Sequence, residues 1–424
     1  MSESTEQTKL QGLSLAPFRG LRPRVDPTRL GRLLCPPYDV IDEATRARLL
    51  ASDPDNAVGV VLPEQSPAGY AGAAARLRGW VDEGLYAADP TPALYVYELR
   101  DGSGHATRGL MGAVELRAAE DGVILPHENT MAGPVADRLE VMTATDADLE
   151  PIYLVYDGGG PASQLIRDID HEQPVAQATT PDGVHHRLWS IHDGDALVTA
   201  MTDLATRRAM IADGHHRYAT YQERQRRRRA ADGPGPWDRG LALVVDSSEY
   251  GPQVHAIHRV VRGLELAEAV RTLSGWASVA SYDGAPSDAL ASIAGVARFG
   301  AVLTDGRQTY VVVDSERRLS AAAARPGEVA ALSDLDVTVT HRAVVERAWQ
   351  RRDDVETVGY AHSIEEALGE VERGGGVAVL LRPTPVAAVA AVAAASGRMP
   401  RKSTLFTPKP ASGLVMRRLV DQVS

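Results

Sequence analysis

Short apolar runs typical of strands alternate with longer stretches of helical periodicity along most of the chain, and this alternation limits the fold more than any other feature. Alternating or continuous apolar patterns predict strands at 93–99, 108–116, 151–157 and 241–246. Apolar positions that repeat at three and four residues predict helices elsewhere, for example at 68–84. The strands and helices do not follow the regular period of a doubly wound sheet. We therefore predict an α+β or mixed α/β fold.

The composition places the chain among globular proteins and argues against several classes of function. Of the 424 residues, 44% are hydrophobic and 24% are charged, which suffices for two or three units with cores of their own. The net charge of -11 argues against a nucleic-acid-binding protein that relies on a general positive surface. Cys35 is the one cysteine, so a disulfide within the chain is excluded.

The N-terminus is polar and lacks the basic-then-apolar order of a signal peptide. No run approaches the roughly 18–20 consecutive apolar residues of a membrane span. We therefore expect a cytoplasmic protein that binds neither nucleic acid nor membrane and takes a small-molecule substrate. The sequence does not indicate an oligomeric state.

The chain divides into four segments by pattern. Residues 1–12 are polar and predict a disordered tail, and residues 13–262 predict a core domain that carries both HENT and DGHHR. From residue 263 a helix, a hairpin and a helix at 333–349 follow, which predicts a C-terminal α+β unit over 263–400. The last segment, 401–424, contains PKPASGL and is expected to pack back on the core.

The stretch IADGHHRY (211–218) predicts a strand, a sharp turn and a helix. Gly214 allows the turn, and the first backbone N–H groups of the following helix form an anion site. Arg217 in that first turn is unfavourable unless an anion compensates it, and its planar fork matches phosphate oxygens. His215 or His216 could stabilise charge or move a proton. Asp213 could hold a magnesium ion or orient a histidine.

Zinc chemistry is the competing interpretation of the histidines. Neighbouring side chains on a helix point about 100° apart, and the usual helical zinc signature places histidines four residues apart. Neither 215/216 nor 185/186 has that spacing. A metal-dependent hydrolase built on His127, His215 and His216 stays open as an alternative, but it is not favoured.

The stretch PHENTMAGPVADRL (126–139) is a second cluster of reactive side chains. Glu128 follows His127, and Arg138 comes a few residues later beside Asp137. A glutamate in a loop can deprotonate a hydroxyl group when its surroundings tune its pKa. The alternative is a capped helix start with a surface ion pair.

Three further stretches supply weaker candidates. His258 and Arg259 lie near the end of the apolar stretch 251–261, which predicts one strand. Tyr38 and Asp39 follow two prolines, which make a rigid loop or a strand edge. Lys409, one of only three lysines, lies between prolines and is followed by a glycine turn.

Taken together, these stretches resemble the bacterial and archaeal domain-of-unknown-function family 1015. The resemblance rests on PPYDVI, HENT with Asp137-Arg138, ALYVYE, PIYLVYD, IADGHHRYATY, HRVV and PKPASGL, in that family's order and over about residues 15–420. Within HENT the family more often has arginine than Asn129, so a role for that position is in doubt. The resemblance implies no established activity.

The DGHHR box is also similar to the glycine–basic–arginine box of the ParB/sulfiredoxin-like superfamily. This second resemblance implies a core of that type, and the superfamily includes partition proteins that bind nucleotides, sulfiredoxin and free-serine kinases. In those folds the box lies at a strand-to-helix turn and holds phosphates. In the serine kinases a glutamate elsewhere is the base, and Glu128 is the candidate by role.

Our leading hypothesis is a nucleotide-dependent phosphotransferase that acts on a small hydroxyl-bearing, possibly serine-like metabolite, with Mg²⁺ and ATP or ADP as cofactors. Gly214, Arg217 and the following amides would hold phosphates, and Lys409 or Arg259 would complete the charge neutralisation. A nucleotide- or metabolite-binding regulator without turnover is the main alternative. DNA binding in the manner of partition proteins is not favoured, because no helix-turn-helix pattern follows the box.

Overall fold

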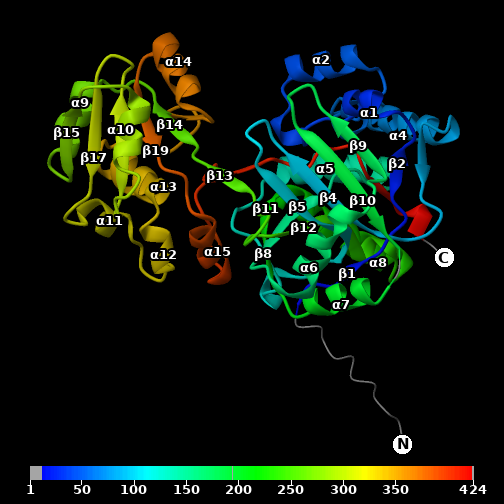
Figure 1. Cartoon of the computed structure of the whole chain (residues 1–424). Coiled ribbons are helices and arrows are strands. Elements are labelled where there is room, and N and C mark those ends of the chain that lie inside the picture. Colours follow the sequence, from blue (N-terminus) through cyan, green and yellow to red (C-terminus); the bar gives the residue numbers. More distant parts are fainter. Residues whose placement is uncertain (1–11, 193, 423–424) are drawn as a thin grey trace, which may run out of the picture. The chain divides into compact units, whose positions relative to one another are not determined.

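The computed structural model describes residues 12–192 and 194–422, and these form two compact units. The first unit comprises the chain up to Leu125, Thr130–Pro252 and the chain from Pro408 on. The second comprises Pro126–Asn129 and Gln253–Thr407. Figure 1 shows strands and helices interleaved along the chain in both units. The mixed α/β fold predicted from the sequence is confirmed.

A nine-stranded sheet forms the centre of the first unit. Its strands lie in the order β6 (Ile124–Leu125), β11 (Ala209–Asp213), β8 (Ile152–Tyr156), β12 (Arg239–Asp246), β5 (Ala106–Glu115), β4 (Leu94–Arg100), β10 (His185–Ile191) and β9 (Ala176–Thr179), with β1 (Leu15–Ala16) beside β5. The pairs β6–β11 and β8–β12 are parallel and the other pairs are antiparallel. Leu154, Ile211 and Val244 on adjacent strands are fully buried in its core.

Helices and short strand pairs complete the first unit. The helices are α1 (Pro27–Leu33), α2 (Glu43–Ser52), α3 (Val58–Val61), α4 (Pro67–Asp82), α5 (Ala132–Thr145), α6 (Gly160–Asp168), α7 (Asp195–Leu204) and α8 (His215–Asp232), with 3-10 turns at Tyr38–Val40, Ala119–Asp121, Ile169–His171, Pro236–Asp238 and Val420–Gln422. Strand β2 (Leu21–Pro23) pairs with β3 (Tyr86–Ala88), and β7 (Ala147–Asp148) pairs with β21 (Arg417–Arg418). Helix α5 packs against α4 and α8, and α6 packs against α7.

The second unit is built on a six-stranded antiparallel sheet. Its order is β15 (Ser278–Tyr282), β17 (Thr309–Val313), β16 (Gly300–Thr304), β19 (Val377–Leu381), β14 (His258–Val261) and β18 (Val358–Ala361). Strands β13 (Gln253–His255) and β20 (Leu405–Thr407) form a separate pair. The helices are α9 (Leu266–Leu273), α10 (Pro286–Ser292), α11 (Arg318–Ala323), α12 (Ala330–Ser333), α13 (Asp336–Val339), α14 (Ile364–Gly374) and α15 (Val386–Ala394), with a π-helix at Thr340–Ala348.

The division into units differs from the expected boundary at residue 262. The apolar stretch 251–261 is not one strand, because it breaks into β13 and β14, which pair within two different sheets of the second unit. The division therefore falls between Pro252 and Gln253. The HENT segment was expected in the core domain, but all of it except Thr130 belongs with the second unit, where the carbonyl of His127 accepts a hydrogen bond from the Met399 amide.

Other local expectations also changed. The patterns above did not predict α1, whose start is fixed by Asp26 as N-cap and Pro27 in the first turn. The helix expected at 333–349 is divided into α13 and the π-helix. The expected N-terminal tail lies outside the described residues except for Gly12. Among the residues described, no helix is both long and apolar enough to span a membrane.

Candidate functional site

The DGHHR box lies at a strand-to-helix turn, as its sequence predicts. Strand β11 ends at Asp213, and α8 begins at His215. Gly214 between them has φ of 92°, a conformation that side chains with a Cβ disfavour. A Cβ at this position would also lie 3.1 Å from Nε of Arg217. The turn therefore requires glycine both for its backbone conformation and for the close approach of Arg217.

Asp213 is held by two cations, one four residues along the chain and one in the distant C-terminal segment. Its Oδ2 accepts a hydrogen bond from Nη2 of Arg217 at 2.5 Å, and its Oδ1 lies 2.5 Å from Nζ of Lys409. The Arg217 side chain is 2% exposed, and its Nη1 donates to the carbonyl of Pro151 at 2.5 Å. We expected Arg217 to face a phosphate, but both of its Nη groups are bonded to protein. Its evident task is to position Asp213.

The PPYD segment brings a second carboxylate to the same ammonium group. Oδ2 of Asp39 lies 3.6 Å from Nζ of Lys409. The backbone amide of Tyr38 donates to Oε1 of Glu150 at 3.0 Å, and the hydroxyl of Ser412 donates to the same oxygen at 2.8 Å. Glu150 is 4% exposed. The PPYD, DGHHR and PKPASGL motifs therefore meet in the first unit, around carboxylates that flank one lysine.

The charges in this cluster keep its cations protonated. Burial lowers the pKa of Arg217, but the carboxylates of Glu150 and Asp213 outweigh it, so that the pKa lies above its ordinary value. Burial also acts against the charged form of Lys409, and Asp213 and Asp39 again reverse the effect and raise the pKa. Three carboxylates thus surround two permanent cations, and the cluster has one negative charge in excess.

Arg138 supports the PPYD segment from the side. Its guanidinium lies 4.1 Å from the centre of the Tyr38 ring, and its Nη2 donates to Oδ2 of Asp137 at 2.6 Å. Its Nη1 donates to the carbonyl of Val61, so that the whole side chain is buried. Burial raises the pKa of Tyr38 well above its ordinary value, so the phenol stays neutral. Arg138 therefore holds the loop that carries Asp39.

The two histidines of the box have different surroundings. His215 is buried, and His216 is partly exposed. Nε2 of His216 accepts a hydrogen bond from the backbone amide of Met131, which precedes α5. Because that nitrogen is already an acceptor, it is a poor candidate for a metal ligand. This contact argues against His216 as one of the metal ligands of the hydrolase alternative.

Four candidates belong to the second unit. His127 is buried, and its Nε2 lies 3.3 Å from Oγ1 of Thr404. Nδ1 of His258 accepts from the amide of Leu381 at 3.2 Å, and burial lowers its pKa to about 4. Glu128 lines a cavity of about 640 Å³ within this unit.

Arg259 is fully buried in the second unit. Its Nε donates to Nε2 of His341 at 2.9 Å, and its Nη2 donates to the carbonyl of Lys402 at 2.9 Å. Burial lowers its pKa to about 10, which still leaves it protonated at neutral pH. These contacts give Arg259 a structural task inside its unit. The role that we predicted for it at the phosphate site stays a prediction.

Sequence reasoning missed Glu150, although it joins the PPYD loop to the C-terminal segment. A single glutamate before Pro151 and a buried strand carries no distinctive spacing. Its position becomes informative only through Ser412, which is 262 residues away along the chain.

Comparisons with known proteins agree with the family expectation. The family described as "Protein of unknown function (DUF1015)" matches residues 15–338. The chain therefore belongs to this family. No curated protein matches the chain.

Several solved structures are similar to it at low sequence identity. A free serine kinase variant in complex with ADP has a TM-score of 0.37 and 12% identity, over 71% of this chain and 90% of that one. A conserved hypothetical protein from Pyrococcus furiosus has a TM-score of 0.34 and 16% identity, over 71% and 94%. A C-terminally truncated SbnI from Staphylococcus aureus has a TM-score of 0.35 and 11% identity, over 71% and 85%.

Proposed function

We propose that this DUF1015 protein is a nucleotide-dependent phosphotransferase that acts on a small hydroxyl-bearing metabolite. One observation carries the proposal. At the strand-to-helix turn, the nearly buried carboxylate of Asp213 contacts Lys409, which also approaches Asp39, and the turn leads directly into an 18-residue helix. A lysine, two carboxylates and a helix N-terminus are groups that phosphoryl transfer uses in one place.

Each group has a distinct task in this proposal. The N-terminal end of α8 favours an anion through the helix dipole. Lys409, with three rotatable donors on a flexible stem, is the cation that can turn from Asp213 toward a phosphate. Arg217 keeps Asp213 in place when Lys409 turns away, because its own contact uses the other carboxylate oxygen.

The residues present fit a magnesium nucleotide by their chemistry. Mg²⁺ prefers one or two carboxylates together with phosphate oxygens, and Asp213 and Asp39 supply such carboxylates around a single ammonium group. Nε of Arg217, beside Gly214, is buried and makes no hydrogen bond among the described residues. When bound, the magnesium nucleotide supplies the phosphoryl group and offsets its charge. The residues of the chain bind and orient it.

We propose Glu128 as the general base, because a carboxylate can take up the proton of the acceptor hydroxyl. A carboxylate that removes the proton from an acceptor hydroxyl raises turnover without contributing much to nucleotide affinity. The variant Glu128→Gln should therefore lose transfer at least tenfold while it keeps its affinity for nucleotide. Glu120→Gln, at an exposed glutamate of the first unit, is the control. Unchanged transfer in Glu128→Gln would exclude Glu128 as the base.

Nucleotide binding is tested by thermal shift with ATP, ADP, CTP and pyrophosphate, each with magnesium. A ligand at 100 times its dissociation constant stabilises the folded protein by about 2.7 kcal/mol. We expect this shift for one nucleotide in the wild type, at least tenfold weaker affinity in Lys409→Met and no change in Lys402→Met, which removes an exposed lysine of the second unit. No shift with any ligand, or an equal shift in Lys409→Met, would refute the proposal.

The same protein samples can be used to distinguish a phosphotransferase from a nucleotide-binding regulator. Incubation with the nucleotide that binds and a pool of hydroxyl-bearing metabolites, followed by ³¹P NMR, shows a phosphorylated product if there is transfer. Binding that depends on Lys409 without any product would indicate a nucleotide-binding regulator instead.

A further inference from the structure

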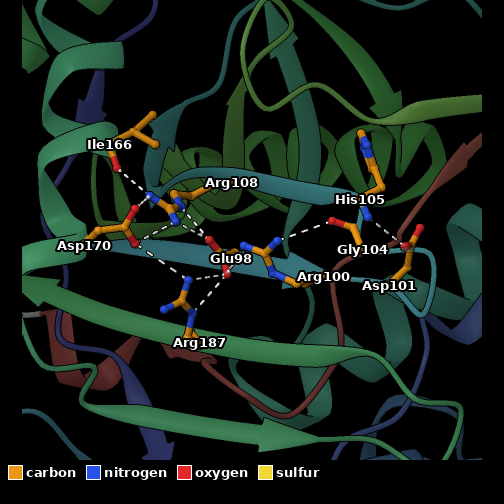
Figure 2. Close-up of polar contacts among 9 residues, drawn as sticks. All are labelled: Glu98, Arg100, Asp101, Gly104, His105, Arg108, Ile166, Asp170 and Arg187. Carbon is orange, nitrogen blue, oxygen red and sulfur yellow. Dashed lines mark hydrogen bonds and ion pairs between the residues drawn. The ribbon is translucent and has the colours of Figure 1, made fainter.

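A second charged cluster lies on the first unit's sheet, centred on Glu98. Figure 2 shows its carboxylate between arginines from the neighbouring strands. Glu98 of β4 is directly opposite Arg108 of β5 and Arg187 of β10. Arg187 donates to Oε1 of Glu98 through Nε and Nη2, at 2.9 and 2.7 Å. One buried glutamate therefore holds an arginine on each side across the sheet.

Arg108 and Asp170 complete the buried part of the cluster. The Arg108 side chain is 3% exposed, and its Nη2 donates to Oδ1 of Asp170 at 2.8 Å and to the Glu98 carboxylate. Its Nη1 donates to the carbonyl of Ile166. Burial would raise the pKa of Glu98, but the hydrogen bonds from Arg108 and Arg187 outweigh it and hold the pKa below its usual value. Arg108 is thus fully occupied by protein groups.

Arg100 adds a third cation to a cluster that has two carboxylates. It lies two residues beyond Glu98 on the same face of β4, and its Nη2 is 3.5 Å from Oε1 of Glu98. Its Nη1 makes only a 3.3 Å contact with the carbonyl of Gly104. Three arginines therefore share the carboxylates of Glu98 and Asp170, which leaves one positive charge in excess. Ion pairs across a sheet face need no ligand, but an excess cation beside a cavity favours the binding of an anion there.

A cavity of about 610 Å³ opens on this face, lined in part by Glu98, Arg100 and Arg187. The strand register places three further lining residues on the same face: Gln177, Thr179 and His185. Gln177 is opposite Arg187, and His185 pairs with Thr179 on one neighbouring strand and with Arg100 on the other. Thr179 and His185 hydrogen-bond to each other, with Oγ1 and Nδ1 2.8 Å apart, so that one of the two keeps a donor for a ligand. Arg100, Arg187 and Gln177 can also donate. The volume is in the range of small-molecule sites.

Arg187 is fixed in position but retains a donor for a ligand. Its guanidinium lies 4.9 Å from the centre of the Trp189 ring, and its Nη1 makes no hydrogen bond among the described residues. Its side chain is 36% exposed and that of Arg100 is 44% exposed, so both reach solvent. A planar fork held by Glu98 and Trp189 is well prepared to bind an oxyanion.

We propose that this cavity binds a small multivalent anion through its carboxylate or phosphate groups, with Arg100, Arg187 and His185 as the recognising side chains. The site is independent of the DGHHR turn, since none of its lining residues belongs to that cluster. The proposal therefore stands or falls separately from the proposed phosphotransfer.

Isothermal titration calorimetry of the full chain with inorganic phosphate, and separately with citrate, tests the site. The test variant is Arg100→Gln/Arg187→Gln. The matched control is Arg226→Gln/Arg227→Gln, which removes the same charge from exposed arginines of α8. Titration of Lys409→Met excludes binding at the DGHHR turn. The two probes distinguish phosphate from carboxylate chemistry.

We expect one probe to bind the wild type, the control and Lys409→Met equally, and the double variant at least tenfold more weakly. If the double variant does not fold, Arg100→Gln alone, at a side chain with only long contacts, should weaken binding severalfold. The proposal is overturned if neither probe binds saturably to the wild type. It is equally overturned if binding survives loss of the two arginines, or falls as much in the control.

Discussion

Asp213→Asn tests the centre of the candidate site through stability, without knowledge of the substrate. The carboxylate accepts from Arg217 on one oxygen and contacts Lys409 on the other. Asparagine keeps one oxygen, and its NH₂ group must then face one of the two cationic donors. One charge-assisted bond is therefore lost and replaced by a donor–donor contact.

The magnitude follows from burial. A hydrogen bond to a charged group contributes about 1.5–3 kcal/mol, and removing one partner of a buried ion pair costs about 3–5 kcal/mol. The Arg217 side chain is 2% exposed, so solvent cannot replace the lost charge. Glu150 remains nearby and also stabilises this guanidinium. We therefore expect a loss near the lower end, about 3 kcal/mol.

The assay is urea unfolding of the full chain followed by circular dichroism. Asp82→Asn, at an exposed position near the end of α4, makes the same chemical change and should alter the free energy of unfolding by less than about 0.5 kcal/mol. A double variant with Arg217→Met should lose less than the sum of the single variants, because the second change removes the unpaired cation. A loss below 1 kcal/mol in Asp213→Asn, or strict additivity, would show that Asp213 and Arg217 do not form the buried pair described above.

Two further changes test the turn and the sheet. Gly214→Ala should destabilise the protein by about 1 kcal/mol more than Gly122→Ala, since both glycines have left-handed backbones but a Cβ at Gly122 meets nothing within 4 Å. Equal losses by urea unfolding would exclude the contact with Arg217. Burial lowers the pKa of His186 to about 4, whereas the unfolded value is about 6.5. Between these values the unfolded chain binds more protons, so stability should fall by up to about 3 kcal/mol as pH drops from 6.5 to 4. His186→Gln should flatten that part of the curve, whereas His185→Gln, at an exposed neighbour, should not.

Local features of the candidate site could be predicted from the sequence, because local interactions determine them. Asp213-Gly214 after an apolar run sufficed for the strand, the turn and the start of α8. The rarity of lysine and the flanking prolines made Lys409 one of the weaker candidates. The capping signal of α1 was equally local, since Asp26 stands directly before Pro27. These two residues are sufficient to predict the start of α1.

The remaining features depend on contacts between distant residues. No pattern around Arg217 shows that its guanidinium is buried against the Pro151 carbonyl. The arginines beside Glu98 become neighbours only through the register of three strands, and a shift of one residue would place them on the opposite face. Arg259 has the chemistry of a phosphate-binding residue. The predicted strand is divided, however, and Arg259 lies in the part that belongs to the second unit.

The C-terminal segment from Pro408 on shows how one distant stretch completes the first unit. Lys409 contacts Asp213, the hydroxyl of Ser412 donates to Glu150, and Nη1 of Arg417 donates to Asp148 at 2.8 Å. Asp148 is fully buried and Glu150 is 4% exposed, so carboxylates left without these partners would be costly.

The same residues that bring a cation to the candidate site thus stabilise the fold around it. Lys409 differs from the other two contacts in its flexible ammonium group and in the second carboxylate, Asp39, within 3.6 Å. The contacts of Ser412 and Arg417 with buried carboxylates serve to stabilise the fold. A cation that replaced this lysine would keep both carboxylates paired. Lys409 is therefore where structure and ligand binding can be separated by experiment.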